Sequence, residues 1–305
     1  MPPSTTLARP RCNKLVAMHL LPRDYRSFFC GAAACGVALL AAAPAHAGGG
    51  WTRQPGHGYA KVGLTLANTT KYHPLNGGTI TTAQFRQQVY SLYAEYGLAK
   101  RLEATLNFPV FRRATFPDTS PGQGVGDPEF GLRYGVLTGK WPLAVQVAAQ
   151  APLGDPNTRG FNKNDPTDFI YLPTGNGQWN IWTRAALSHT LGTLPAYITL
   201  EAGYNFRTGG LTNQYTYGVQ AGYKFFDKLW FTASVRSLDN VRAPNPAKLA
   251  NIGLGEGVAY SAASLGASYA LTKHFSVTAD VAGGFGKLRN VYSGLQSTFG
   301  VAVEW

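Results

Sequence analysis

The chain has 305 residues, with 27 lysines and arginines against 15 aspartates and glutamates and a formal net charge of +12 at pH 7. The basic residues stand mostly singly and form no long runs, which argues against a nucleic-acid-binding protein. All three cysteines, Cys12, Cys30 and Cys35, precede residue 48, so a mature chain without this segment has no disulfide and no cysteine-ligated metal.

Residues 1–47 have the pattern of a signal peptide. Arg23 and Arg26 form a basic region, residues 28–43 are mostly apolar, and Ala45-His46-Ala47 matches a small-x-small cleavage site. About 16 apolar residues are fewer than the roughly 20 that a spanning helix needs, which weighs against a membrane anchor. We expect cleavage before Gly48, leaving 22 basic and 14 acidic residues, and Met18 is an alternative translation start.

After the signal, apolar and polar residues alternate strictly. In residues 215–225 every odd position is aromatic, Val or Ala, and every even position is Thr, Gly, Gln or Lys. The chain closes in the same way, with Phe299, Val301, Val303 and Trp305 separated by small or polar residues. This period of two predicts strands, and since no later segment resembles a spanning helix, a membrane fold must be a closed barrel.

The alternation predicts twelve strands within a barrel domain at 58–305, after a short segment at 48–57. They are expected near 58–69, 87–96, 102–111, 127–137, 141–151, 179–190, 196–207, 215–225, 229–238, 260–271, 275–286 and 296–305. Twelve is even, as expected for a bacterial barrel with both termini on the periplasmic side. The ten residues before the first strand leave no room for an amino-terminal plug.

The predicted connections alternate in length, as periplasmic turns and external loops do in outer-membrane barrels. Five are short, at 97–101, 138–140, 191–195, 226–228 and 272–274. The links between them are mostly longer, at 70–86, 112–126, 152–178, 208–214, 239–259 and 287–295. The loop at 152–178, rich in Gly, Asn, Asp and Pro, is long enough to fold inward as a constriction, or it remains a solvated external loop.

If the apolar set faces lipid, the charged residues face the lumen. The basic set is Lys61, Arg133, Arg184, Arg207, Lys224 and Arg236, and the acidic set is Glu95, Glu103, Glu129, Glu201, Asp280 and Glu304. Arg184, Arg207 and Arg236 fall in the half with long loops, where a ring of like charge selects anions. The alternative is structural ion pairing with Glu201 and Glu129.

Four aromatic residues also fall on the lumen side: Tyr93, Trp182, Tyr197 and Trp230. They offer stacking surfaces to a solute, or they fill space in a narrow barrel. No catalytic, cofactor or metal site is predicted. Ser188 and His189 are adjacent on one strand and therefore point to opposite faces, so they cannot form a nucleophile–base pair.

Several motifs together resemble the outer-membrane family named for the MetA pathway of phenol degradation. They are Tyr96-Gly97-Leu98 followed by Arg101-Leu102, Gly124-Val125-Gly126-Asp127 leading into Phe130-Gly131-Leu132-Arg133-Tyr134, Pro152-Leu153-Gly154-Asp155, and Gly175-Asn176-Gly177-Gln178. The resemblance covers residues 96–178 and implies a barrel that passes hydrophobic or aromatic compounds. The chain is less similar to the long-chain fatty-acid transporters, whose plug domain has no counterpart here.

The sequence thus predicts an all-β, transmembrane, antiparallel up-and-down barrel in the bacterial outer membrane. The expected function is passive uptake of small solutes, hydrophobic or aromatic ones among them. The alternatives are an outer-membrane enzyme of the lipid hydrolase type and a structural barrel with a filled lumen. The expected partners are membrane lipid, a small-molecule solute and the outer-membrane assembly machinery, which would contact the strand ending at Trp305; no nucleic acid and no cofactor is expected.

Overall fold

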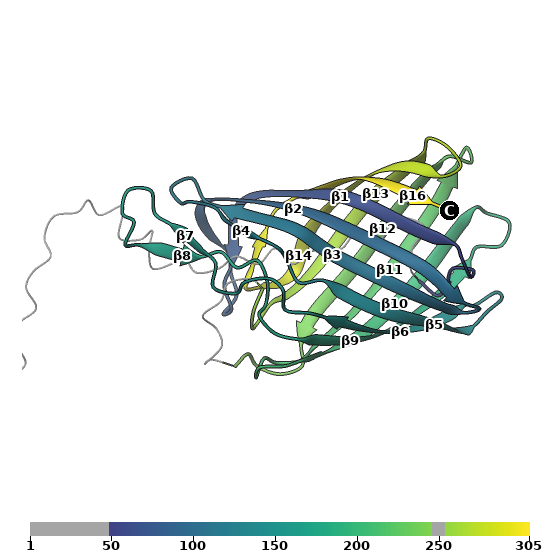
Figure 1. Ribbon diagram of the computed structural model, residues 1–305, viewed down its shortest axis with the longest axis horizontal. Helices are drawn as coiled ribbons and strands as arrows, with labels where there is room; N and C mark the ends of the chain where they lie inside the picture. Colours follow the sequence, from purple (N-terminus) through teal and green to yellow (C-terminus); the bar gives the residue numbers. More distant parts are fainter. Residues whose placement is uncertain (1–48, 246–253) are drawn as a thin grey trace, which may run out of the picture. The chain divides into compact units, whose positions relative to one another are not determined.

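The computed structural model describes residues 49–245 and 254–305, and the signal peptide predicted at 1–47 lies outside this range. Twelve long strands form an antiparallel barrel that closes where β1 pairs with both β2 and β16 (Figure 1). The barrel strands are β1 (Gly58–His73), β2 (Ile80–Ala99), β3 (Leu102–Thr115), β5 (Glu129–Leu137), β6 (Leu143–Gln150), β9 (Asn180–Thr190), β10 (Ala196–Arg207), β11 (Gln214–Phe225), β12 (Leu229–Asn240), β13 (Ala259–Ala270), β14 (Phe275–Arg289) and β16 (Gln296–Glu304). Four short strands, β4 (Gly122–Gly124), β7 (Arg159–Phe161), β8 (Phe169–Tyr171) and β15 (Val291–Ser293), belong to the long-loop end. The predicted fold class is confirmed.

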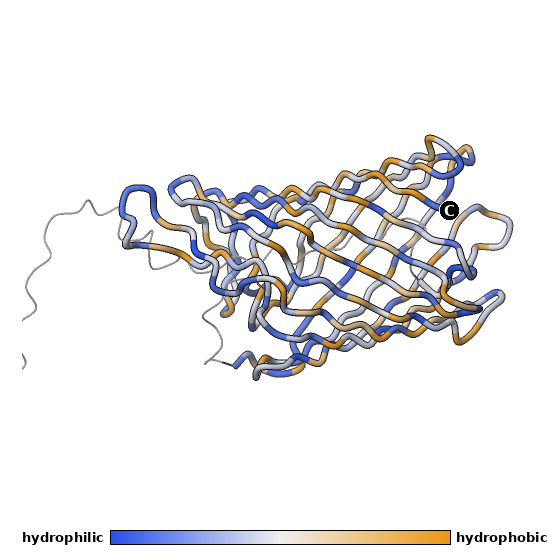
Figure 2. Tube along the Cα trace, in the orientation of Figure 1, coloured by the Kyte–Doolittle hydropathy of each residue, from blue (hydrophilic) through white to orange (hydrophobic). Residues whose placement is uncertain are grey.

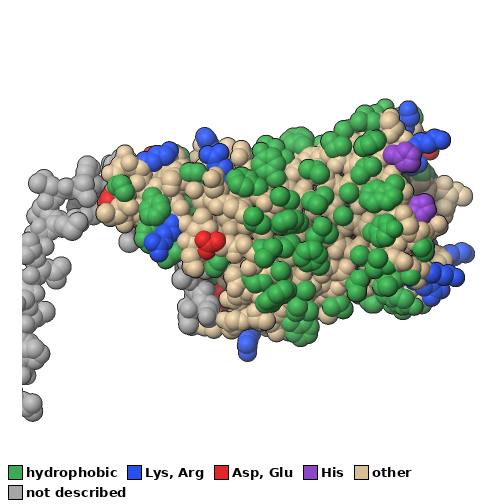
Figure 3. All heavy atoms as spheres, in the orientation of Figure 1, with side chains coloured by type: hydrophobic (Ala, Val, Ile, Leu, Met, Phe, Trp, Pro, Cys, Tyr) green, Lys and Arg blue, Asp and Glu red, His purple; other side chains and the backbone are tan. Residues whose placement is uncertain are grey.

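The side chains alternate between lipid and lumen as the sequence predicts. On β1, Val62 is 62% exposed and its neighbour Lys61 only 6%; on β10, Leu200 is 52% exposed and Thr199 only 1%. Hydropathy alternates along the strands, and hydrophobic side chains cover the middle of the wall while lysines and arginines gather toward its ends (Figures 2 and 3). An apolar outer wall on a closed barrel is the arrangement of a bacterial outer-membrane protein.

The short turns lie at the same end of the barrel as Trp305 (Figure 1). Between β11 and β12, Phe226 and Asp227 both have positive φ, 47° and 56°, and the Lys228 amide donates to the Phe225 carbonyl at 3.2 Å. Two consecutive residues with positive φ and this hydrogen bond form a tight hairpin turn, and only residues 226–228 separate the two strands. Among the described residues no helix is long and apolar enough to cross a membrane.

The first three strands are longer than predicted. β1 has 16 residues, β2 has 20 and β3 has 14, so most of the loop expected at 70–86 is strand and only 74–79 form the turn. The period of two continues through this region, since Phe85 and Gln87 are buried while Arg86 and Gln88 are exposed. One side of the barrel therefore extends beyond the apolar band at the long-loop end.

Candidate functional site

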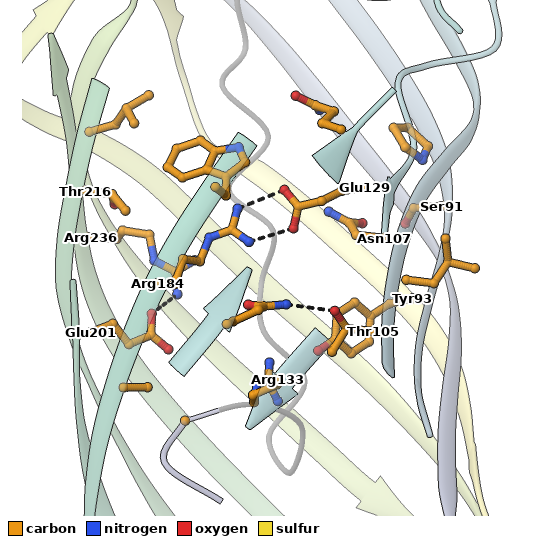
Figure 4. Close-up of a pocket in the computed structure, with 18 of the residues that line it drawn as sticks. Ser91, Tyr93, Thr105, Asn107, Glu129, Arg133, Arg184, Glu201, Thr216 and Arg236 are labelled. Atoms are coloured by element: carbon orange, nitrogen blue, oxygen red, sulfur yellow. Dashed lines mark hydrogen bonds and ion pairs between the residues drawn. The ribbon is translucent and has the colours of Figure 1, made fainter. Parts of the chain in front are cut away.

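The inward side chains surround a cavity of about 350 Å³ in the middle of the barrel (Figure 4). Two walls differ in chemistry. One carries the guanidinium groups of Arg184 and Arg236, from β9 and β12, and the opposite wall carries polar groups of β2 and β3. The polar residues of that wall that Figure 4 labels are Ser91, Tyr93, Thr105 and Asn107.

The two cavity arginines are ion-paired. Arg184 donates two hydrogen bonds to the Glu129 carboxylate, at 2.6 and 2.8 Å, and its guanidinium lies 4.5 Å from the centroid of the Trp182 ring. Arg236 donates to Glu201 at 2.5 Å. The structure therefore has the structural ion pairs that the sequence analysis weighed against a ring of free positive charge.

Two of the lumen ion pairs join residues of strands that are not neighbours, and a glycine on the intervening strand leaves room for the contact. Glu201 of β10 and Arg236 of β12 are both in register with Gly218 of the intervening β11. Lys61 of β1 contacts Asp280 of β14 at 3.3 Å across β16, where a Cβ on Gly300 would lie 2.8 Å from the Lys61 Cε. Each of these two cations thus reaches a carboxylate two strands away, across a glycine on the intervening strand.

A third group of charges is packed toward the periplasmic end. Arg133 contacts Glu103 at 2.7 Å and Glu95 at 3.3 Å, and the Tyr93 hydroxyl donates to Glu95 at 2.5 Å. Both carboxylates are almost completely buried. Arg133 thus borders the cavity, but its guanidinium is already paired with two carboxylates.

Arg207 lies away from the other arginines, outside the cavity wall. Its side chain is 2% exposed and donates to the Gly255 carbonyl at 3.1 Å and to Asn180 at 3.3 Å, with Glu256 at 3.8 Å. Glu256 is itself completely buried and accepts from the Thr212 amide at 2.9 Å. Arg207 therefore holds the loop after residue 253 against the barrel, and the structure brings only Arg184 and Arg236 of the predicted trio together at the cavity.

The segment before β1 enters the periplasmic mouth of the lumen. The Gly50 amide donates to the Ser188 hydroxyl at 2.8 Å, and a Cβ on Gly50 would lie 2.0 Å from the Pro142 carbonyl oxygen. The Trp51 ring packs edge-on against Tyr197 at 5.7 Å. The ten residues predicted before the first strand are too few for a plug domain, but the part of this segment that the structure describes lies across the mouth, with Gly50 bonded to Ser188 and Arg53 to Glu103.

Arg53 anchors this segment to the opposite wall. Its guanidinium contacts Glu95 at 3.1 Å and also pairs with Glu304, and its backbone amide donates to Glu103 at 2.8 Å. Three lumen carboxylates of β2, β3 and β16 thus converge on one residue that precedes the barrel. The glycines at 49 and 50 were the sequence signal for the close approach of this segment to the Pro142 side of the mouth, because only a residue without a side chain fits against that wall.

The four predicted lumen aromatics divide into two pairs. Tyr93 and Trp182 line the cavity. Tyr197 and Trp230 lie 5.7 Å apart, next to Trp51, and fill the periplasmic mouth. Two of the four aromatic residues therefore border the cavity, and the other two fill space at the mouth.

At the extracellular end an apolar cluster narrows the lumen. Phe85 stacks on Tyr292 at 4.6 Å, Phe116 lies 5.5 Å from Phe85, and Leu172 is completely buried among them. Leu172 belongs to the loop at 152–178, whose β7–β8 hairpin lies outside the barrel (Figure 1). One part of this loop therefore folds inward as a constriction, and another part remains an external loop.

Three of the family-like motifs meet at Asp127. Its carboxylate accepts from the Gly154 amide at 2.8 Å and from the Asn176 amide at 2.6 Å, and a Cβ on Gly175 would lie 2.2 Å from the carboxylate oxygen. Thr174 adds a bond from the Asp155 amide at 2.9 Å. These motifs hold the inward part of the loop in place.

The predicted separation of Ser188 and His189 is confirmed. The Ser188 hydroxyl faces the lumen and contacts Thr199 at 2.8 Å, while His189 stacks on Trp141 at 4.1 Å on the outer side. Within residues 49–245 and 254–305, no group of three His, Cys, Asp or Glu side chains is placed to hold a metal ion.

No family model matches the chain, and no curated protein matches it in sequence. Among solved structures it is similar to an outer membrane channel from Pseudomonas putida F1, with a TM-score of 0.61 and 15% identity, over 83% of this chain and 97% of that one. It is also similar to the translocator domain of the autotransporter NalP from Neisseria meningitidis, with a TM-score of 0.50 and 10% identity, over 81% and 88% of the two chains. At identities this low, the structural similarity establishes the fold alone. The fold and the apolar outer wall define a bacterial outer-membrane β-barrel.

Proposed function

We propose that this barrel is a passive channel for small solutes. The observation that carries the proposal is the cavity of about 350 Å³ between the two narrowed ends of the lumen, since a barrel built only as a scaffold needs no such space. Its walls offer hydrogen-bond donors and acceptors to a passing solute, and the paired charges keep the net field small. The similarity to the Pseudomonas channel supports the same function.

Aromatic or hydrophobic compounds are the proposed solute class. The family-like motifs support this choice, and Trp182 and Tyr93 place two aromatic groups in the cavity wall. Arg184 and Arg236 are the proposed selectivity residues, because each lies at the cavity and is about 30% exposed there. We further propose that the strand ending at Trp305 contacts the outer-membrane assembly machinery.

A liposome uptake assay tests the function. Purified mature protein in liposomes should admit small aromatic solutes such as phenol derivatives faster than protein-free liposomes do, while a tetrasaccharide should be excluded by the narrow lumen. Equal uptake of the aromatic solute with and without protein would indicate a structural barrel with a filled lumen.

Lipid-ester hydrolysis is the second candidate function, and one observation favours it. On the outer face at the extracellular end, the Ser293 hydroxyl lies 2.6 Å from His73 Nε2, while His73 Nδ1 lies 2.9 Å from the Gly78 carbonyl oxygen. This pair was not predicted from the sequence, where only Ser188 and His189 stood out as a possible nucleophile and base. A backbone carbonyl, in place of a carboxylate, orients the imidazole, which provides weaker support for a general base.

A phospholipase assay separates the two candidates. The channel proposal predicts no ester hydrolysis by the wild type or by Ser293→Ala. Hydrolysis by the wild type that is lost in Ser293→Ala would establish the enzyme.

A further inference from the structure

A basic patch lies on the outer face of β2 and β3 above the apolar band. Arg86 and Arg113 are both exposed, and each stands between two buried residues that point inward: Phe85 and Gln87 on β2, and Arg112 and Ala114 on β3. Arg86 and Arg113 therefore point outward, toward the lipid side of the wall. We call these two residues the outer arginine pair.

The register places the two guanidinium groups close together. Arg113 pairs with Gln88 and Arg86 pairs with Thr115, so the outer arginine pair occupies diagonal positions on neighbouring strands. Such positions lie about 7–8 Å apart, within the reach of both side chains to a common ligand. Gln88 and Gln84 add exposed or half-buried amide groups on the same face, and Arg86 donates to Gln84 at 3.1 Å.

Aromatic residues indicate where the outer arginine pair lies relative to the membrane. Tyr90 of β2 and Phe111 of β3 contact each other at 6.1 Å on the outer face, and they are the last aromatic residues of the apolar band on these strands. Aromatic rings of this kind favour the boundary between hydrocarbon and headgroups. Arg86 lies four residues, or roughly 13 Å of strand, beyond Tyr90, and Arg113 lies two residues beyond Phe111. The pair therefore stands at the level of the headgroups of the outer leaflet.

Among the described residues neither arginine forms an ion pair, and the only carboxylates on β1 to β4 are Glu95 and Glu103, which are buried in the lumen at the periplasmic end. Lys71 of β1 adds a further exposed cation higher on the same side of the barrel. Cations without an acidic partner at the level of the headgroups attract anionic groups of the membrane surface.

We propose that the outer arginine pair binds the phosphate groups of lipopolysaccharide, the phosphorylated glycolipid of the outer leaflet. Arginine offers a planar fork of donors that matches phosphate oxygens, and this binding is charge-assisted. The glutamine amides beside it are suited to sugar hydroxyls. The bound glycolipid would cover the extended side of the barrel formed by β1 to β3.

Binding of deep-rough lipopolysaccharide to detergent-purified mature protein tests the proposal. Each cation near an anionic lipid surface strengthens binding about fivefold, so Arg86→Gln with Arg113→Gln should weaken it roughly 25-fold. The matched control is Lys224→Gln with Lys228→Gln, two cations at the periplasmic end, which should leave the affinity unchanged. Equal losses in the two double variants, or no loss in either, would overturn the proposal.

Two further arms identify the ligand. Dephosphorylated lipopolysaccharide should bind the wild type as weakly as the intact glycolipid binds the arginine variant, because the phosphates are the groups recognised. Inorganic phosphate at millimolar concentration should not displace the glycolipid, and displacement would point instead to a site for free anions. An unchanged urea midpoint of the arginine variant would show that the loss of affinity is not a loss of fold; if the midpoint falls, the charge-preserving Arg86→Lys with Arg113→Lys should retain most of the binding.

Discussion

Arginine at Leu200 tests which face of β10 meets the lipid. Leu200 is 52% exposed and pairs with Val219, which is the sixth of the twelve residues of β11. With a rise of roughly 3.4 Å per residue and a tilt of about 40°, Val219 lies on the order of 15 Å above the periplasmic end, near the middle of an apolar band about 25 Å tall. Arginine at that depth costs about 2–4 kcal/mol, which is roughly a 30- to 700-fold shift in the folding equilibrium.

The assay is urea-induced unfolding of the protein in phospholipid vesicles. Gln220→Arg is the matched control, because Gln220 follows Val219 and is half-buried on the lumen side. Its side chain reaches water inside the barrel, so the change should cost less than about 1 kcal/mol. Equal destabilisation by Leu200→Arg and Gln220→Arg would refute the assignment of faces.

Three further changes test the lumen and its loops. Arg236→Gln should cost about 1–3 kcal/mol by leaving Glu201 unpaired, and the double change with Glu201→Gln should recover part of that loss in a double-mutant cycle; strictly additive costs would contradict the ion pair. Gly50→Val cannot fit beside the Pro142 carbonyl, so the amino-terminal segment should leave the mouth and single-channel conductance should rise, and a conductance equal to wild type would show that the segment does not limit flow. Asp127→Asn presents an amide donor to backbone amides and should cost about 1–3 kcal/mol, with faster proteolysis at 152–178; unchanged proteolysis would contradict its role in holding the loop.

The barrel and its faces were predictable because one face of each strand meets lipid. The contrast between Val219 and Gln220, or between Leu200 and Thr199, appears directly in the residue types, and the span at 196–207 matched β10 residue for residue. The pairing of Arg236 with Glu201 was a named alternative, since opposite charges on the same face of nearby strands meet across a small residue.

The ends of the lumen could not be predicted in the same way. The entry of Trp51 into the mouth depends on contacts with Tyr197, which lies almost 150 positions along the chain, and no local period encodes such a pairing. The burial of Leu172 depends equally on Phe85 and Tyr292 from other strands. The strand extensions around Arg86 were missed because both faces carry polar residues where the wall leaves the membrane. The sequence there shows no alternation of apolar and polar residues, although the side chains still alternate in burial.

Single-channel conductance in planar bilayers tests most directly the claim that the lumen is a solute pathway narrowed by the amino-terminal segment. The measurement compares the mature wild type with a variant that lacks residues 48–54, which leaves every barrel strand intact because β1 begins at Gly58. We predict small conductance steps for the wild type and clearly larger steps for the deletion variant. Absence of conductance in both folded proteins would contradict a continuous pathway, and equal conductance in both would contradict the role of the segment.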